Sequence, residues 1–236
     1  MTQQAVLLAA GEGRRLRPLT LTTPKPLLRV GGKPLIHWQL ERLAAVGVTQ
    51  VIINLAWLGQ QIREYLTTQP QLGLEVIFSE EPAPLETGGA LLFARHRIHA
   101  DSFWLVNADS WCPALPPLSE PAPGQVQLGM VPNPAFHPQG DFYFNSSTGQ
   151  LACSASPATP NTATFSGISR FSRQVLSDQT LLECYGKHYT PGEAFALAPL
   201  LRFLIQKGRA QGLWIPQGWV DVGTPERLQA LDAEFK

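Results

Sequence analysis

Hydrophobic residues in the first half of the chain follow two alternating spacings. Four short apolar runs, bounded by Gly, Pro or polar residues, have the length of buried strands: 6–10, 51–53, 74–78 and 103–107. Three intervening segments carry apolar residues at helical spacing: 34–46, 58–66 and 87–95. Short strands that alternate with helices predict an α/β fold, with helices on both faces of a sheet whose strands in this half are parallel.

The second half of the chain has a different pattern. Turns rich in Pro and Gly separate three further predicted strands, at 126–131, 141–144 and 165–171. Helical spacing returns at 194–207 and at 225–235, and one or two strands are expected within 212–222. The added strands predict a mixed sheet with a small β-rich insertion that faces a substrate.

The composition is that of one globular domain with a sizeable core. The chain has 236 residues, 44% of them hydrophobic, and its proline-rich loops are too short to be interdomain linkers. We therefore predict a single domain over residues 1–236. Within it, residues 1–110 would form one half of the sheet and residues 111–236 would complete it.

Charge, hydropathy and cysteine content exclude several classes of function. The net charge is zero and the pI is about 7, so we expect no nucleic-acid partner. We expect no membrane span, because no apolar run approaches the roughly 18 residues that one needs, and the first residues lack the pattern of a secretory signal. Three widely spaced cysteines predict reduced thiols in a cytoplasmic protein.

A glycine-containing loop follows the first predicted strand directly. Gly11, Glu12 and Gly13 would let main-chain N–H groups approach an anion, and three cations follow at Arg15, Arg17 and Lys25. The loop is neither a P-loop nor a dinucleotide fingerprint, because both motifs require glycine where Leu16 stands. A phosphate-holding loop and a plain βα turn with solvated basic side chains both fit this segment.

Two aspartates are the candidates for metal chemistry. Ligands bind beyond the carboxyl ends of parallel strands, and this rule places Gly11, Asn54, the 86–89 segment and Asp109 at one edge of the sheet. Asp221 lies in an apolar stretch, where an unpaired carboxylate would be costly. Two carboxylates with nucleotide phosphates suit Mg²⁺. The alternatives are a turn or helix-capping aspartate at 109 and a structural salt bridge at 221.

Three segments carry a resemblance to a known family. They are LAAGEGRRLRPLTLTTPKPLLRVGGKPLI (8–36), VNAD (106–109) and WVDVGTPE (219–226). The chain resembles the sugar-1-phosphate nucleotidylyltransferases over essentially its whole length. This resemblance implies a Rossmann-like, GT-A-like nucleotidyltransferase fold. It also implies a nucleotide-binding first half and a sugar-binding second half.

Four shorter segments are similar to one subfamily, the N-acetylmuramate-1-phosphate uridylyltransferases: 53–62, 84–90, 137–142 and 164–169. Three positions depart from the usual pattern. Arg14 replaces a small hydroxyl residue, Ala108 replaces the glycine of a Gly-Asp pair, and Leu55 replaces a histidine. Arg14 makes the loop more basic, Ala108 should leave the following carboxylate undisturbed, and Leu55 alters one minor contact.

The resemblance implies the transfer of a uridylyl group from UTP to a sugar 1-phosphate, here N-acetylmuramate 1-phosphate, with release of pyrophosphate, in peptidoglycan recycling. Main-chain groups of residues 11–13 would hold the triphosphate, and Arg15 would neutralise the departing pyrophosphate. Lys25 would bridge the α-phosphate and the sugar phosphate, and Asp109 and Asp221 would hold Mg²⁺. Positioning and charge neutralisation would therefore carry the catalysis.

Further residues are candidates for the base and the sugar. For the base they are Ala9, Ala10, Glu86, Thr87 and Gly88. For the sugar they are Asn54, Trp57, Asn107, Asp141, Ser166 and Gly167. Some of these roles have an equal structural alternative. The alanines would serve tight βα packing, Trp57 would be a core residue, and Ser166 and Gly167 would simply end a strand.

Two other functions remain open at this point. A hexose-1-phosphate enzyme that uses GTP, dTTP or UTP, with mannose 1-phosphate as one example, would have the same loop and aspartates. A catalytically inactive sensor of nucleotide sugars would share the fold, although the presence of Lys25, Asp109 and Asp221 argues against it. We expect a monomer with small-molecule substrates.

Overall fold

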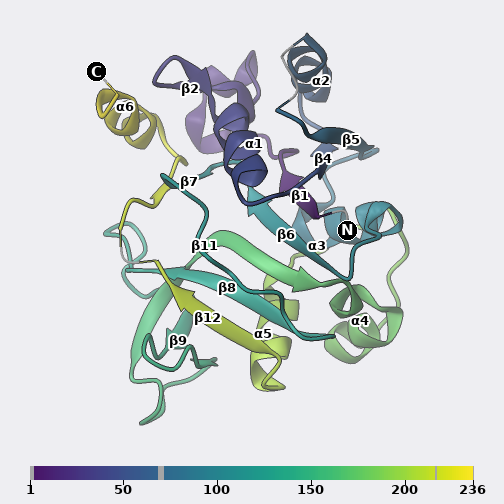
Figure 1. Cartoon of the computed structure of the whole chain (residues 1–236), viewed down its shortest axis with the longest axis vertical. Helices are drawn as coiled ribbons and strands as arrows, with labels where there is room; N and C mark the ends of the chain where they lie inside the picture. Colours follow the sequence, from purple (N-terminus) through teal and green to yellow (C-terminus); the bar gives the residue numbers. More distant parts are fainter. Residues whose placement is uncertain (1–2, 69–71, 216, 236) are drawn as a thin grey trace.

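A nine-stranded mixed sheet forms the centre of the molecule (Figure 1). The computed structural model describes residues 3–68, 72–215 and 217–235. Seven strands lie in the order β10-β9-β11-β6-β1-β4-β5, while β8 pairs with β11 and β12 pairs with β8. Their bounds are β1 Gln4–Leu8, β4 Gln50–Leu55, β5 Glu75–Glu80, β6 Ser102–Asn107, β8 Val126–Val131, β9 Phe142–Phe144, β10 Leu151–Ala152, β11 Asn161–Ser172 and β12 Ala210–Trp214.

The first half of the chain supplies four parallel strands. Strand β1 pairs with β4 on one side and with β6 on the other, and β5 pairs with β4. In this register Leu8 lies opposite both Asn54 and Asn107. The carboxyl ends of the three central strands therefore lie at one level, as the rule for parallel sheets predicts.

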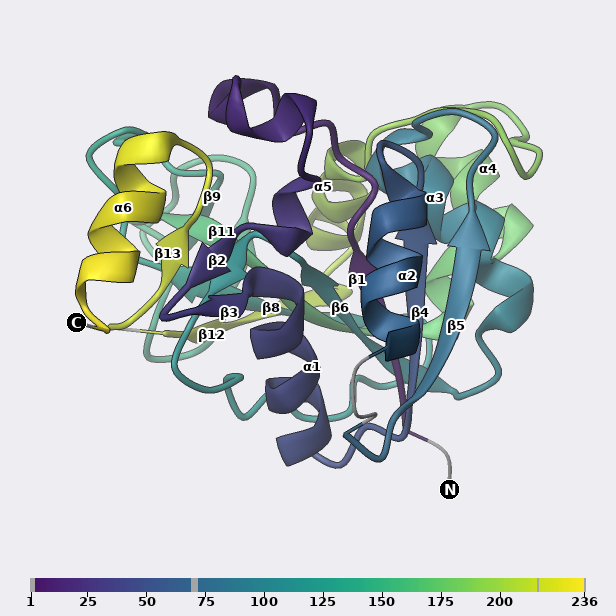
Figure 2. The same ribbon diagram turned by 90° about the horizontal axis from the view of Figure 1, so that it is seen from above.

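Helices cover both faces of the sheet, as predicted (Figure 2). Helices α1 (Leu35–Ala45) and α2 (Gly59–Thr68) pack with Ala5 and Leu7 of β1. On the other face, α3 (Glu86–Ala94), α4 (Asp178–Tyr185) and α5 (Ala198–Gln206) pack with Val6 of the same strand. Successive residues of β1 thus enter opposite cores, as expected of a strand that is buried on both sides.

The second half of the chain adds strands that run in both directions. Strand β11 is 12 residues long, extends beyond the predicted 165–171, and runs antiparallel to both β6 and β8. Helix α4 was not predicted, although Ser177 caps its first turn and Gly186 ends it in the left-handed conformation. The helix predicted over 194–207 begins only at Ala198.

Short elements complete the fold around the carboxyl edge. Strand β7 (Ser110–Trp111) pairs with β13 (Val220–Asp221). The region 212–222, where one or two strands were predicted, contains the end of β12 and the whole of β13. Helix α6 (Pro225–Ala233) follows. Strands β2 (Arg29–Val30) and β3 (Lys33–Pro34) form a small hairpin that was not predicted. None of the helices in the described residues has the length and apolarity needed to span a bilayer.

Candidate active site

A cavity of about 450 Å³ opens at the carboxyl ends of β1, β4 and β6, and we call it the first cavity. It brings together most of the predicted nucleotide-side residues and three of the predicted catalytic residues. Predicted residues on its wall are Ala9, Ala10, Gly11, Gly13, Arg15, Lys25, Asn54, Glu86, Thr87, Asn107 and Asp109. These residues come from five separate stretches of sequence, which the sheet register aligns.

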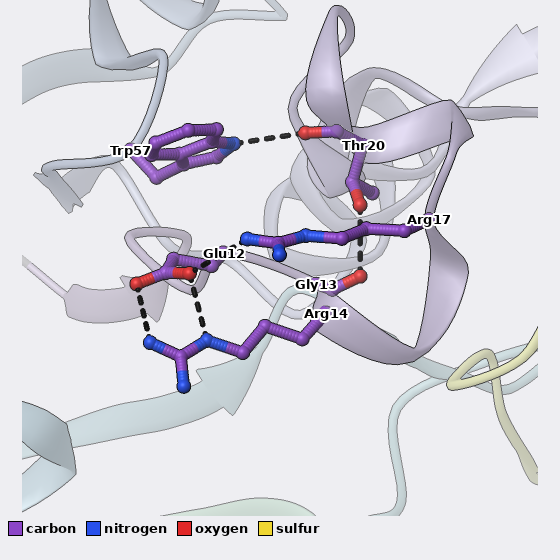
Figure 3. A network of polar contacts seen from close by, with 6 residues as sticks. All are labelled: Glu12, Gly13, Arg14, Arg17, Thr20 and Trp57. Carbon is purple, nitrogen blue, oxygen red and sulfur yellow. Dashed lines mark hydrogen bonds and ion pairs between the residues drawn. The ribbon is translucent and has the colours of Figure 1, made fainter.

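The loop after β1 is tightly folded around Gly13. This residue has φ +62°, and a Cβ atom there would lie 2.9 Å from Cγ2 of Thr20. The buried Thr20 hydroxyl donates a hydrogen bond of 2.8 Å to the Gly13 carbonyl oxygen (Figure 3). Glycine is therefore needed here for both its left-handed conformation and its lack of a side chain.

The Glu12 side chain pairs with cations of its own loop (Figure 3). Its carboxylate accepts hydrogen bonds from Arg14 at 2.8 and 3.0 Å and from Arg17 at 3.2 Å. The hydrogen bond from Arg14 lowers the pKa of Glu12, although this carboxylate is exposed to solvent. Glu12 thus compensates for Arg14, the residue at which the sequence departs from the family pattern, and Arg15 and Lys25 pair with the aspartates instead.

Trp57 is half-buried beside the loop, and its role as a sugar platform stays a prediction. Its indole N–H donates a hydrogen bond of 2.9 Å to the Thr20 carbonyl oxygen (Figure 3). Gln61 on α2 donates a second bond of 2.9 Å to the Thr22 carbonyl oxygen. These two side chains tie the loop between residues 13 and 25 to the start of α2.

The two candidate metal aspartates lie on neighbouring backbone segments. Asp221 is opposite Ser110 in the β7–β13 pair, and the Val222 N–H donates a hydrogen bond of 3.0 Å to the Asp109 carbonyl oxygen. Lys25 forms an ion pair with Asp109. The pairing of β7 with β13 therefore joins residues more than a hundred positions apart in the chain into one acidic edge.

Cations of two different segments approach Asp221. Arg227 Nη1 lies 2.8 Å from Asp221 Oδ2, and Arg15 Nη2 lies 3.9 Å from the same oxygen. The Arg15 side chain is 64% exposed, whereas those of Arg227 and Asp221 are 18% and 19% exposed. The salt bridge with Arg227 matches the structural alternative stated for Asp221, and it leaves the second carboxylate oxygen available.

The donors at this edge suit a magnesium ion that is held partly by substrate. The described residues contain no group of three His, Cys, Asp or Glu side chains placed to enclose a metal. Magnesium commonly takes one or two carboxylates and completes its shell with water and substrate phosphates. Two aspartates at the edge of the first cavity fit that pattern, and Mg²⁺ binding stays a prediction.

The sequence analysis missed Glu81, a buried carboxylate on the wall of the first cavity. It accepts hydrogen bonds from the Asn54 amide at 2.7 Å and from the Leu85 N–H at 3.1 Å, and burial raises its pKa. Asn54 in turn accepts the Ala9 N–H at 2.6 Å. This chain of contacts joins the ends of β1 and β4 to the start of α3. Glu81 directly follows β5, so the strand-end rule could have identified it.

Residues at the start of α3 dock this helix onto the segment before α5. The Gly88 N–H donates a hydrogen bond of 2.9 Å to the Phe195 carbonyl oxygen. The Thr87 hydroxyl oxygen accepts the Leu197 N–H at 3.2 Å. Glu86 has φ +57°, an uncommon conformation for a residue with a side chain. Thr87 and Glu86 also line the first cavity, whereas Gly88 packs behind it.

Three of the predicted sugar-side residues, Asp141, Ser166 and Gly167, have structural partners. Asp141 accepts the Phe165 N–H at 2.8 Å and lies 3.2 Å from the His137 ring nitrogen. Gly167 has φ +76°, and a Cβ atom there would lie 2.5 Å from the Ser110 hydroxyl. The Ser166 carbonyl oxygen accepts the Trp219 indole N–H at 2.8 Å. Ser166 and Gly167 lie within β11, at its register shift against β8, and not at a strand end; this irregular stretch supports the edge that carries the aspartates.

A second cavity of about 290 Å³ lies beyond β13 and receives Asp221 and Arg227. The remaining residues of its wall are Val131, Pro132, Asn133, Pro134, Phe136, Ile215, Gln217, Gly218, Trp219 and Val220. Because Gly223 lines the first cavity, the two cavities meet at the short segment 221–223. Sequence reasoning identified Asp221 on this wall and missed Arg227.

Relatives of known activity match different shares of the chain. The Nucleotidyl transferase family model matches residues 4–120. An N-acetylmuramate alpha-1-phosphate uridylyltransferase from Neisseria meningitidis is 36% identical over 98% of this chain and 97% of its own. A mannose-1-phosphate guanylyltransferase catalytic subunit beta from Drosophila melanogaster is 42% identical, but over only 46% of this chain and 30% of its own.

Solved structures match the fold over the whole chain. The inositol-1-phosphate CTP transferase from T. maritima has a TM-score of 0.74 at 18% identity, and the match covers 100% of this chain and 96% of that one. HddC from Yersinia pseudotuberculosis, complexed with GMP-PN, has a TM-score of 0.72 at 23% identity over 100% of both chains. The nucleotidyltransferase fold is thus confirmed, and the relative matched from end to end shows that the chain belongs to the sugar-1-phosphate nucleotidyltransferase family.

Proposed function

We propose that the chain forms UDP-N-acetylmuramate and pyrophosphate from UTP and N-acetylmuramate 1-phosphate, as a step of peptidoglycan recycling in the cytoplasm. The observation that carries this proposal is the match to the Neisseria uridylyltransferase, which extends over both halves of the chain. The match to the mannose-1-phosphate enzyme covers less than half of the chain. The unpaired state of Cys112, Cys153 and Cys184 agrees with a reducing compartment.

The first cavity suits the nucleotide and its triphosphate. Ala9, Ala10 and Gly11 line it together with Glu86 and Thr87 at the start of α3. Small residues leave room for a base, which main-chain groups could read by hydrogen bonding. Arg15 lines the same cavity and would neutralise the triphosphate as pyrophosphate departs, whereas Arg14 is paired with Glu12.

Lys25 is placed to bring two anions together. Its ammonium group lines the first cavity and contacts Asp109, and its side chain is only 13% exposed. The attacking oxygen belongs to a phosphate that is already anionic, so the reaction needs no side chain as a general base. The barrier instead comes from the approach of two like charges, which a fixed cation lowers.

Asp109 and Asp221 would hold magnesium beside Lys25. When bound, the metal would neutralise charge on the α-phosphate and the sugar phosphate. The backbone pairing of β7 with β13 keeps the two aspartates at one edge, and their carboxylates are already engaged by Lys25, Arg15 and Arg227. Substrate phosphates would therefore enter a site in which Asp109 and Asp221 each already have a cationic partner.

A pyrophosphate-release assay across UTP, GTP, dTTP and CTP, each with a panel of sugar 1-phosphates, tests the proposal. We expect turnover with UTP and N-acetylmuramate 1-phosphate to exceed that with any other pair. Activity restricted to GTP and mannose 1-phosphate would instead support the hexose-1-phosphate alternative. Binding of nucleotide sugars without pyrophosphate release from any pair would support the inactive sensor.

A further inference from the structure

The second cavity has one acidic and one basic side chain on a wall that is otherwise uncharged among the residues the structure describes. Its charged wall residues, within the described part of the chain, are Asp221 and Arg227. The other wall residues are aliphatic, aromatic, proline, glycine or amide-bearing. Because Asp221 and Arg227 pair with each other at 2.8 Å, the cavity carries no net charge in this state.

Arg227 is held in place by contacts on several sides. The centre of its guanidinium group lies 3.9 Å from the centroid of the Phe136 ring, which also lines the cavity. A Cβ atom at Gly223 would lie 2.4 Å from Nη2 of Arg227, so the guanidinium packs directly against this backbone. A stacked guanidinium presents its N–H groups edge-on, in a geometry that suits a planar carboxylate.

The proposed reaction changes the partner that Arg227 needs. If Asp221 shares its carboxylate with magnesium, Arg227 loses part of its counter-charge. The Arg227 side chain is 82% buried, since 18% of it is exposed, and a buried cation without a partner is costly. A substrate that places a second anion in the cavity would restore the charge balance.

We infer that Arg227 binds a carboxylate substituent on the sugar of the sugar 1-phosphate. The inference rests on the proposed function and assigns its sugar selectivity to a single residue. In N-acetylmuramate the carboxylate belongs to the 3-O-lactyl group, which N-acetylglucosamine lacks. Arg227 thus selects acidic sugars over neutral ones, because only an acidic sugar replaces the charge that Asp221 withdraws.

Kinetics with two matched substrates test this assignment. N-acetylmuramate 1-phosphate and N-acetylglucosamine 1-phosphate differ only in the lactyl group. We expect wild-type kcat/KM with UTP to be higher for the acidic sugar by about tenfold or more, the size expected of a charge-assisted hydrogen bond. In Arg227→Gln this ratio should fall close to one, and in Arg227→Lys it should take an intermediate value.

Product binding supplies a second measurement that does not depend on turnover. Calorimetry would compare UDP-N-acetylmuramate with UDP-N-acetylglucosamine, first with Mg²⁺ and then with EDTA. We expect wild type to prefer the acidic product more strongly with Mg²⁺, because the metal competes for Asp221. Arg227→Gln should bind both products equally under both conditions, and its thermal melting would show that it is folded.

Arg63→Gln is the matched control. Arg63 also pairs with a carboxylate, that of Glu80, and its guanidinium lies 4.3 Å from the Phe78 ring centroid, but it lies on α2. This variant should keep the wild-type preference for the acidic sugar.

Two results would overturn the assignment. One is a wild-type enzyme that uses both sugars equally. The other is an Arg227→Gln variant that loses activity equally with both, which would limit Arg227 to positioning Asp221. If wild type releases no pyrophosphate with either sugar, the proposed function fails, and the calorimetric preference alone then decides the role of Arg227.

Discussion

The two cavities that meet at residues 221–223 are built in different ways. The first lies at the aligned ends of parallel strands, and its wall combines alanines and glycines with charged and polar side chains. The second is walled by side chains from the loop after β8 and from the segment around β13. Sheet register fixes the first wall, whereas side-chain identity shapes the second. We infer that the reaction is set by the first wall and the choice of sugar by the second.

The largest expected effect comes from removing the charge where the two cavities meet. Asp221→Asn keeps the size of the side chain but removes an anion that faces Arg15 and Arg227. We expect turnover to fall by about 10³-fold. The fold should be kept at a lowered melting temperature, because the largely buried Arg227 loses its counter-charge. Asp178→Asn, at an aspartate on α4 that pairs with Arg95, serves as the control and should keep full turnover. Unchanged turnover in Asp221→Asn would remove this residue from the metal site.

A smaller but still large effect is expected within the first cavity alone. Asn54→Leu removes the acceptor for the Ala9 N–H and the donor to the Glu81 carboxylate. Two buried polar groups lose a partner, so unfolding free energy should drop by about 3 kcal/mol and KM for UTP should rise about tenfold. Urea unfolding and initial-rate kinetics measure the two quantities. If the variant instead raised KM for the sugar phosphate and not for UTP, Asn54 would contact the sugar, as the sequence predicts.

A several-fold effect should separate loop positioning from sugar contact. Trp57→Phe keeps an aromatic ring but removes the N–H that binds the Thr20 carbonyl oxygen. We expect kcat to fall about threefold to tenfold, the equivalent of one hydrogen bond, and to fall equally for every accepted sugar. Trp38→Phe removes a similar indole bond to the Val30 carbonyl oxygen and should leave kcat unchanged. A change confined to KM for the sugar would make Trp57 a sugar platform instead.

The smallest expected effect is a pH dependence of stability from the first cavity. Burial raises the pKa of Glu81 above its ordinary value of 4.5, so the folded state holds this proton more tightly than the unfolded state does. The stabilisation from this group is present below pH 4.5 and is lost as pH rises through the folded pKa. The unfolding free energy of wild type minus that of Glu81→Gln should therefore be smaller at pH 8 than at pH 4. An equal difference at both pH values would contradict the raised pKa.

Sequence patterns located the regular elements of the first half because local information was sufficient there. Each apolar run became a strand and each segment of helical spacing became a helix, with ends that shifted by a few residues. In the second half, β11 proved longer than its apolar run because it pairs with β6, β8 and β9. The start of the helix predicted at 194 moved to 198, since Phe195 and Leu197 bind the start of α3 instead.

By itself, the sequence indicated the family through a long contiguous motif, and the relative matched over 98% of the chain confirms it. It also singled out a candidate phosphate loop and two candidate metal aspartates, because these depend on residue type at strand ends. The tertiary structure alone decided which charges meet. It paired Glu12 with Arg14, Lys25 with Asp109, and Arg227 with Asp221. It also joined the Trp57 indole to the Thr20 carbonyl oxygen of the loop, and the buried Glu81 carboxylate to the Asn54 amide. Ion pairs and hydrogen bonds act over a few ångströms between segments that are remote in the chain, so only folding can select their partners.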